Sequence, residues 1–396
     1  MLSSIAIILL FGLLMGWLFS KLNLPRLLGM IIVGIIISPH CLNIVDDSIL
    51  AISGHLRQIA LVIILTRAGL SLNLSDLKKA GLPAVLMCFL PATVEIIAII
   101  ILAPSLLGVS ILDASIIGSV IAAVSPAVVV PRMIKLMEEG YGKDKYIPQI
   151  ILAGASVDDV FVIVIFTALT TLASTGEISV ASFLQIPISI LLGIALGCLV
   201  GMVLVWFFKK FHMRDSVKVL IILSVSFLLL ELQSRLENIV SISGLLAIVS
   251  MGIFINQKYS VLAKRLSGKY NKMWLGAEIF LFVLVGIAVD FNYALSAGFA
   301  VIILVVLAIL FRMVGVTLSL AKTNLNKKER LFCALAYTPK ATVQAAIGTI
   351  PLAMGLLCGK IVLTVAVLSI LITAPFGAIC IDNSYKRLLS KQTEEQ

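Results

Sequence analysis

Charged and aromatic residues are scarce in this chain of 396 residues, at 13% and 7% of the sequence. Soluble domains carry about 25% charged residues, so the low charge excludes an ordinary soluble protein. The 30 Lys and Arg give a net charge of +10, but they are scattered between apolar runs. With so few aromatic residues they do not indicate a nucleic-acid-binding surface. Because 61% of the residues are hydrophobic, the sequence predicts an all-α polytopic membrane protein embedded in the lipid bilayer.

Patterns for binding a resident metal or cofactor are also missing. The six Cys lie far apart without a Cys-x-x-Cys pair, and the three His are not paired with one another or with Cys. We therefore expect the cysteines to be small apolar core residues, and we expect no cofactor.

Apolar runs long enough to cross a bilayer fill the rest of the chain. The first run has no positive residue before it and no A-x-A site after it, so we expect an ordinary first helix rather than a signal peptide. Apolar runs punctuated by charges, Gly or Pro give thirteen candidate spans, at 2–19, 22–38, 55–73, 80–103, 111–137, 147–172, 183–208, 217–232, 239–256, 274–290, 294–320, 330–354 and 360–381.

The basic residues indicate how these spans are oriented. Nearly all of the 30 Lys and Arg fall in alternate loops and in the C-terminal tail. The exceptions are three residues at the other side (Arg57, Arg235 and Lys360) and three inside spans (Arg67, Arg312 and Lys340). Since cytoplasmic loops are enriched in Lys and Arg, the N-terminus is predicted outside and the C-terminus in the cytoplasm.

Two adjacent carboxylates, Asp158 and Asp159, lie at the middle of the sixth span. A charge at this depth costs about 2.5–3.5 kcal/mol, which argues for pairing, hydration or function. Neighbouring residues on a helix differ by about 100° in direction, so both carboxylates can flank one water-filled cavity. Such a pair can hold either a proton or a small hard cation.

Proline interrupts two spans at matched positions. Ser125 precedes Pro126 in the fifth span, and Thr338 precedes Pro339 in the twelfth. A mid-span Pro breaks the backbone hydrogen bonds, and freed backbone groups persist in a membrane where they line a cavity or pack on protein. The two hydroxyls and the loose carbonyls are candidate cation ligands.

The fifth and twelfth spans are seven apart, so the two broken helices run in opposite directions through the membrane. Spans one to six and eight to thirteen then form inverted repeats, as in many secondary transporters. Glu95 in the fourth span and Arg312 in the eleventh are mates in this scheme, and a mutual ion pair is the economical interpretation. Lys340 is placed to neutralise helix ends or to pair with an acid. The side chain of Arg67 is expected to reach the membrane–water interface, and Glu278 has no evident partner in the sequence.

These residues resemble the monovalent cation:proton antiporter superfamily, and most closely the NHA-type sodium/proton exchangers related to NapA and NhaA. The resemblance rests on VSPAVVVP at 124–131, GASVDD at 154–159 and TPKATVQAA at 338–346. It covers essentially the whole chain.

The resemblance implies a homodimer in a bacterial inner membrane. It implies one exchanger domain over residues 1–383, with a core at about 80–172 and 294–381 and a dimer scaffold at about 1–73 and 183–290. Residues 384–396 would be a short cytoplasmic tail. The core would move as an elevator, with Asp158 and Asp159 binding Na⁺ or Li⁺ and releasing it on protonation. Arg312 stands where NhaA- and NapA-like members have a lysine, which makes one proton per cation at least as plausible as two.

The sequence therefore predicts a secondary antiporter that exchanges Na⁺ or Li⁺ for H⁺ and is not an enzyme. A K⁺/H⁺ antiporter of the same fold is the nearest alternative, since oxygen ligands serve either cation. An intramembrane aspartyl protease is remote because its two Asp must face each other from different helices. A cation channel is disfavoured by the inverted repeats and by the lack of a filter-like carbonyl run.

Overall fold

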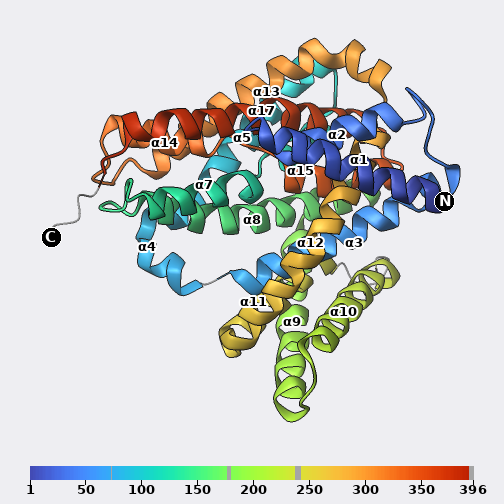
Figure 1. The fold of residues 1–396 in the computed structure, drawn as a ribbon, viewed down its shortest axis with the longest axis horizontal. Coiled ribbons are helices and arrows are strands. Elements are labelled where there is room, and N and C mark those ends of the chain that lie inside the picture. The colour runs from blue at the N-terminus through green and yellow to red at the C-terminus, as the bar shows by residue number, and fades with distance from the viewer. Residues whose placement is uncertain (73, 176–179, 237–241, 392–396) are drawn as a thin grey trace. The chain divides into compact units, whose positions relative to one another are not determined.

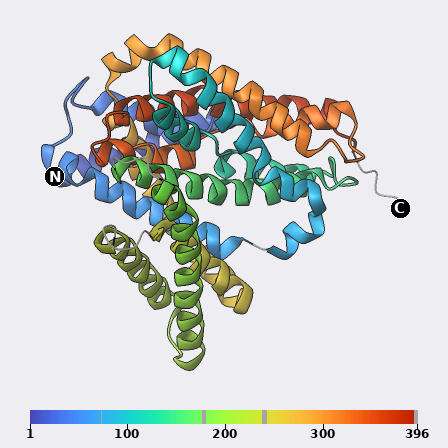
Figure 2. The ribbon, with the colours of Figure 1, turned by 180° about the vertical axis from the view of Figure 1, so that it is seen from behind.

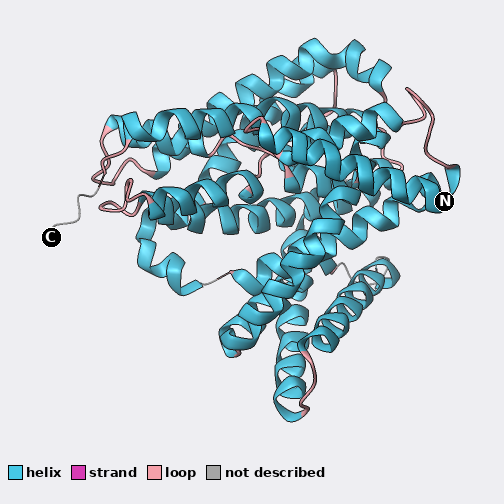
Figure 3. Cartoon of the chain, viewed as in Figure 1, coloured by secondary structure: helices cyan, strands magenta, loops and turns pink. Residues whose placement is uncertain are grey.

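The computed structural model describes residues 1–72, 74–175, 180–236 and 242–391. These described residues are helical almost throughout, and their only β interaction is an isolated bridge between Tyr141 and Lys391. Short loops join the helices (Figure 3). The first nine helices are α1 (Leu2–Lys21), α2 (Arg26–Ile37), α3 (Asp47–Ser71), α4 (Leu74–Met87), α5 (Leu90–Leu107), α6 (Ile111–Ile121), α7 (Pro126–Glu138), α8 (Ile147–Thr175) and α9 (Val180–Lys210). They are followed by α10 (Asp215–Leu236), α11 (Gly244–Lys258), α12 (Ser260–Ala288), α13 (Phe291–Ser319), α14 (Lys327–Ala336), α15 (Thr342–Ile347), α16 (Ile350–Ala353) and α17 (Gly359–Leu388).

Nine helical segments of the described chain are long and apolar enough to cross a membrane. The all-α membrane architecture predicted from composition is therefore present. Each of the thirteen predicted spans overlaps a helix or a pair of helices around a break, but four of them fall outside the nine. These four are 22–38, 217–232, 239–256 and 330–354, and residues 239–241 lie outside the described part of the chain.

The chain divides into two compact units. Unit 1 comprises residues 1–51, 74–162 and 282–396, and unit 2 comprises 52–73 and 163–281. The core and scaffold expected from the resemblance differ from these units mainly at residues 1–51, which belong to unit 1 by their contacts.

Unit 1 is built around a long contact between α5 and α13, with α6 packed beside α5. Helix α17 contacts α13, α14 and α6, so the last helix of the chain lies against both helices that precede the breaks (Figure 1). From behind, α5 (teal) is seen against α13 (orange) (Figure 2). The large apolar side chains of α1, including Leu10, Phe11 and Trp17, are exposed on its outer face. This is the surface expected of a helix that meets lipid.

Unit 2 depends on a close approach of α9 to α11. Gly193, Gly197 and Gly201 recur every four residues along α9 and face α11. A Cβ atom at Gly197 would overlap the carbonyl oxygen of Ala247 and lie 2.8 Å from the Cβ of Ser250. Lipid tails are as apolar as side chains, so small residues that bring backbones together are a main source of helix association in membranes.

This close packing predicts that Gly197→Ala destabilises the protein by about 1–3 kcal/mol, because the added methyl must push α9 away from α11. The measurement is the thermal unfolding midpoint of the purified protein in detergent. Gly276→Ala on α12 is the matched control, because a Cβ there meets no described atom within 4 Å. The control is expected to be neutral or stabilising by about 0.5–1 kcal/mol, the usual gain of Ala over Gly in a helix. Equal midpoints for both variants would contradict the packing argument.

Candidate cation site at two broken helices

Both predicted helix breaks are present. Helix α6 ends at Ile121 and α7 begins at Pro126, and the intervening Ser125 has an extended backbone (φ −86°, ψ 109°). Helix α14 ends at Ala336 and α15 begins at Thr342, with Pro339 between them. The cause is local in each case, because Pro lacks an N–H and disfavours helical geometry in the residue before it.

The two unwound segments lie against each other in unit 1. The Ser125 N–H donates to the Pro339 carbonyl oxygen at 2.7 Å, joining the segments directly. Lys340 Nζ donates to the Ile121 carbonyl, and Gln344 Nε2 donates to the Ala123 carbonyl at 2.8 Å. Backbone groups freed by one break are therefore satisfied by residues of the other break.

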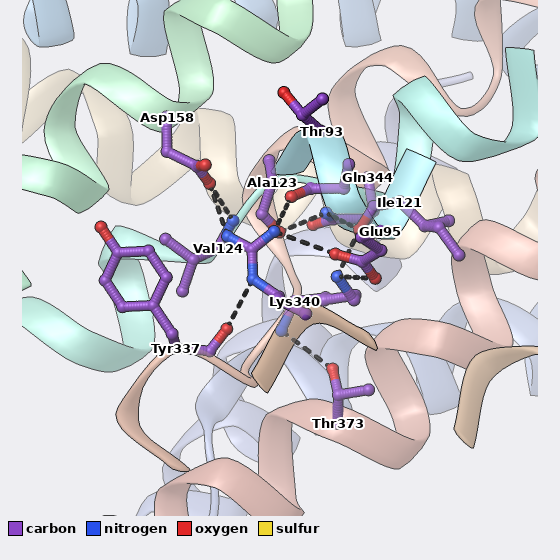
Figure 4. A network of polar contacts seen from close by, with 12 residues as sticks. Thr93, Glu95, Ile121, Ala123, Val124, Asp158, Tyr337, Lys340, Gln344 and Thr373 are labelled. Atoms are coloured by element: carbon purple, nitrogen blue, oxygen red, sulfur yellow. Dashed lines mark hydrogen bonds and ion pairs between the residues drawn. The ribbon is translucent and has the colours of Figure 1, made fainter. Parts of the chain in front are cut away.

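Arg312 on α13 is fully buried and binds four acceptors. Its Nη1 donates to Glu95 Oε2 at 2.9 Å and to the Ala122 carbonyl, and its Nη2 donates to Asp158 Oδ2 at 2.8 Å. Its Nε donates to the Tyr337 carbonyl at 2.8 Å (Figure 4). One guanidinium thus joins two carboxylates to both breaks, which suits the fixed fork of donors that Arg presents.

Lys340 completes the network. Its Nζ lies 2.7 Å from Glu95 Oε1, and the side chains of Glu95, Asp158, Arg312 and Lys340 are all 0% exposed. The ion pair between Glu95 and Arg312 that the sequence favoured is present, with Arg312 Nη1 at 2.9 Å from Glu95 Oε2. Two positive and two negative groups balance one another, as burial requires.

Asp159 is the carboxylate left over from this balance. It follows Asp158 on α8 and is partly exposed, but its Oδ1 is buried and accepts no hydrogen bond from the described residues. Asp158 Oδ2 accepts from Val124 N–H at 2.7 Å as well as from Arg312, whereas Asp158 Oδ1 and Ser125 Oγ also have no hydrogen-bond partner there. The region therefore combines one uncompensated carboxylate with several free oxygens, a donor set that suits a hard cation.

The two predicted hydroxyl ligands differ in their surroundings. Ser125 is buried next to Val124, whose N–H binds Asp158. Thr338 instead donates from Oγ1 to the Leu335 carbonyl at 2.9 Å, and its Oγ1 lies against Gly377 of α17. Ser125 is therefore the better placed of the two to act as a ligand.

Three polar contacts of the site were not singled out from the sequence. Thr373 of α17 accepts the freed N–H of Lys340 at 2.9 Å. The Tyr337 ring centroid lies 5.3 Å from the Arg312 guanidinium carbon, a cation–π arrangement. Gln344 Nε2 donates to the carbonyls of Ile121 and Ala123 at the first break. The available signal was that each of the three is a polar side chain inside an apolar span.

Glycine lets neighbouring helices approach the site closely. A Cβ atom at Gly154, one turn before Asp158, would overlap the Tyr337 hydroxyl, and a Cβ at Gly377 would overlap the Pro339 ring. Substitution at either position would displace groups that contact Arg312 or the second break.

Arg67 and Glu278, in unit 2, interact electrostatically with each other. No partner for Glu278 was evident from the sequence, because α3 and α12 are far apart in the chain and their proximity is decided by packing.

A family profile described as "Sodium/hydrogen exchanger, transmembrane" matches residues 5–382. The chain belongs to the sodium/hydrogen exchanger family. It is 34% identical to Sodium/hydrogen exchanger 9B2 of Mus musculus over 393 residues, which cover 94% of this chain and 70% of the relative. It is 33% identical to Sodium/hydrogen exchanger 9B1 of Homo sapiens over 378 residues, covering 90% and 71%.

Among solved structures, the exchanger's fold is similar to that of the sodium proton antiporter MjNhaP1 from Methanocaldococcus jannaschii. The TM-score is 0.84 at 20% identity, with 98% of each chain covered. Sodium/hydrogen exchangers are membrane transporters of monovalent cations and protons, not enzymes. The intramembrane-protease alternative is therefore excluded.

The network predicts that Arg312→Lys destabilises the exchanger by about 1–3 kcal/mol for each buried acceptor that loses its donor, although Lys keeps the positive charge. A single ammonium group cannot serve four acceptors that lie on four different segments. Thermal unfolding of the purified protein measures the loss. Arg265→Lys is the control, because Arg265 forms an exposed pair with Asp215 and is expected to matter by less than about 1 kcal/mol. Similar midpoints for Arg312→Lys and the control would contradict the role given to the guanidinium.

Proposed function

We propose that this exchanger carries Na⁺ or Li⁺ in one direction and H⁺ in the other, with both ions competing for Asp158 and Asp159. The observation that carries the proposal is the charge imbalance at the breaks. Arg312 and Lys340 are matched by Glu95 and Asp158, and Asp159 is left without a cationic partner within ion-pair distance among the described residues. An uncompensated carboxylate within a membrane is costly, and binding either a proton or a cation removes that cost.

Competition for one site is sufficient to couple the two fluxes. If the loaded carrier crosses readily and the empty, ionised carrier does not, each cation that leaves must be replaced by a proton. In this scheme Asp159 is the main cation ligand and Asp158 shares the proton. Ser125 is the next candidate ligand and Thr338 a weaker one. Arg312 stays protonated in proteins, so it locks the network and does not itself carry the proton. The cation is cargo, and no resident cofactor takes part.

We propose that the site alternates between the two membrane faces by an elevator movement. The moving core would consist of the spans within about 80–172 and 294–381, and the scaffold of those within 1–73 and 183–290, in thirteen spans with inverted repeats. Support comes from the two broken helices, which pair with each other inside unit 1, and from the packing of α5 against α13, the predicted inverted mates. Pro126 and Pro339 would keep both breaks open, while Glu95, Arg312 and Lys340 would hold them together.

The assembly is proposed to be a homodimer in a bacterial inner membrane, with the N-terminus outside. The orientation is supported by the basic residues of alternate loops, which mark the cytoplasmic side. Residues 384–396 would then be a cytoplasmic tail.

The test of the site is Asp159→Asn in proteoliposomes, with sodium-driven proton movement followed by a pH-sensitive dye. Asn keeps the size of the side chain but cannot hold a proton or a negative charge, so exchange is expected to fall to the level of empty liposomes. Asp144→Asn is the matched control, since Asp144 is exposed in the loop before α8 and bonds Ser390. Exchange that survives Asp159→Asn would contradict the assignment of Asp159 as the main cation ligand.

The rate of exchange measured against the concentration of Na⁺, Li⁺ or K⁺ distinguishes Na⁺/H⁺ exchange from the K⁺/H⁺ alternative. We expect saturation by Na⁺ and Li⁺, with an apparent KM for Na⁺ that rises as the pH falls because protons compete for the site. A KM for Na⁺ independent of pH would contradict shared occupancy, and saturation by K⁺ alone would make the protein a K⁺/H⁺ antiporter.

A further inference from the structure

The end of α6 presents carbonyl oxygens to the interior of unit 1. The last carbonyls of any helix lack partners within the helix, and in a membrane interior water does not replace them. Here the carbonyls without helical partners belong to Ile121, Ala122 and Ala123, and all three residues are fully buried. Side chains must therefore satisfy them.

Three side chains do so, and they differ in kind. Arg312 donates to Ala122 and Lys340 donates to Ile121, but both cations are also bound to carboxylates. Gln344 is neutral, and its Nε2 donates to Ala123 at 2.8 Å and to Ile121 at 3.3 Å. Gln344 is 1% exposed, so its carboxamide is buried with these carbonyls (Figure 4).

The Ala123 carbonyl shares its peptide plane with the Val124 N–H. That peptide bond is trans and planar, so the carbonyl and the N–H point in opposite directions on one rigid unit. The carbonyl end is held by Gln344, and the N–H end donates to Asp158 Oδ2 at 2.7 Å. Turning the plane at one end necessarily turns it at the other.

We propose that Gln344 is a positioning residue that sets the affinity and selectivity of the cation site through the Ala123–Val124 peptide plane. Its carboxamide fixes the plane, the plane fixes the N–H on Asp158, and Asp158 thereby presents its free oxygen in a constant direction. The N–H groups of Val124 and Ser125 donate to Asp158 and to the Pro339 carbonyl instead of to a carbonyl of α6. The inference rests on the proposed function, since it assumes that Asp158 takes part in cation binding.

A purely structural Gln344 would behave differently. Loss of packing would lower the thermal stability and the amount of active protein, which reduces the maximal rate, but the surviving molecules would bind Na⁺ with unchanged affinity. A positioning role changes the KM for Na⁺ instead. It also changes the preference between cations, because discrimination depends on how rigidly the ligand oxygens are held.

The experiment uses Gln344→Met, which keeps the length of the side chain and removes the donors. In proteoliposomes the apparent KM for Na⁺ is expected to rise about tenfold, equivalent to about 1.4 kcal/mol, while the maximal rate stays within about twofold. The ratio of the KM values for Li⁺ and Na⁺ is expected to move toward one. Sodium-dependent thermal stabilisation of the purified variant gives a second measure of binding that needs no transport, and its midpoint concentration is expected to shift by the same factor.

Thr342→Val is the matched control. Thr342 lies two residues earlier on α15, is equally buried, and its hydroxyl has no hydrogen-bond partner among the described residues. Its substitution is expected to leave the KM unchanged. If Gln344→Met does not purify as a monodisperse protein, Gln344→Leu replaces it, since Leu also has no donor and is close in size, and the same increase in KM is expected.

An unchanged KM together with a lower unfolding midpoint would overturn the proposal and assign Gln344 to packing. Failure of both variants to fold, with Thr342→Val intact, would overturn it in the same way. Failure of the proposed function is recognised separately, because unsubstituted protein would then show neither sodium-driven proton movement nor stabilisation by Na⁺.

Discussion

The structure depends on one constraint, that backbone groups freed inside a membrane protein must find partners without water. Two proline breaks release carbonyls at the end of α6 and backbone groups around Pro339, among them the Lys340 N–H. Residues of one break satisfy most of the freed groups of the other. Ser125 N–H donates to the Pro339 carbonyl, and the side chains of Lys340 and Gln344 donate to carbonyls at the end of α6 and in the first break. Thr373 on α17 accepts the remaining Lys340 N–H, so a third helix is required. The irregular backbone is stable because it is paired, which also holds the site in one shape.

Charge follows from the same geometry. A buried cation without a counterion has a large desolvation penalty. Arg312 and Lys340, which donate to buried carbonyls, therefore form ion pairs with Glu95 and Asp158. Asp159 adds one negative charge to a network that is already balanced. In the function proposed above, this extra negative charge is what binds a single proton or cation.

Much of the site could be read from the sequence because membrane insertion makes polar residues conspicuous. Asp158 and Asp159, the two breaks, and the deep charges Glu95, Arg312 and Lys340 all stood out against apolar runs. The individual contacts could not be read in the same way. Thr338, for example, has the same place before its proline as Ser125, but its hydroxyl donates to the Leu335 carbonyl at the end of its own helix. Thr373 and Gln344 gave weak signals because an uncharged polar residue is common in transmembrane helices.

The sequence by itself determined the membrane class, the helical architecture and the positions of the breaks, since hydrophobic length and proline chemistry act locally along the chain. Tertiary packing alone decided which freed carbonyl meets which donor, why Glu278 lies near Arg67, and which carboxylate is left uncompensated. These contacts join residues far apart in the chain, such as Gln344 and Ile121, which are 223 positions apart. Their distances depend on how close glycines such as Gly154 and Gly377 allow the helices to come, and no local pattern encodes that approach.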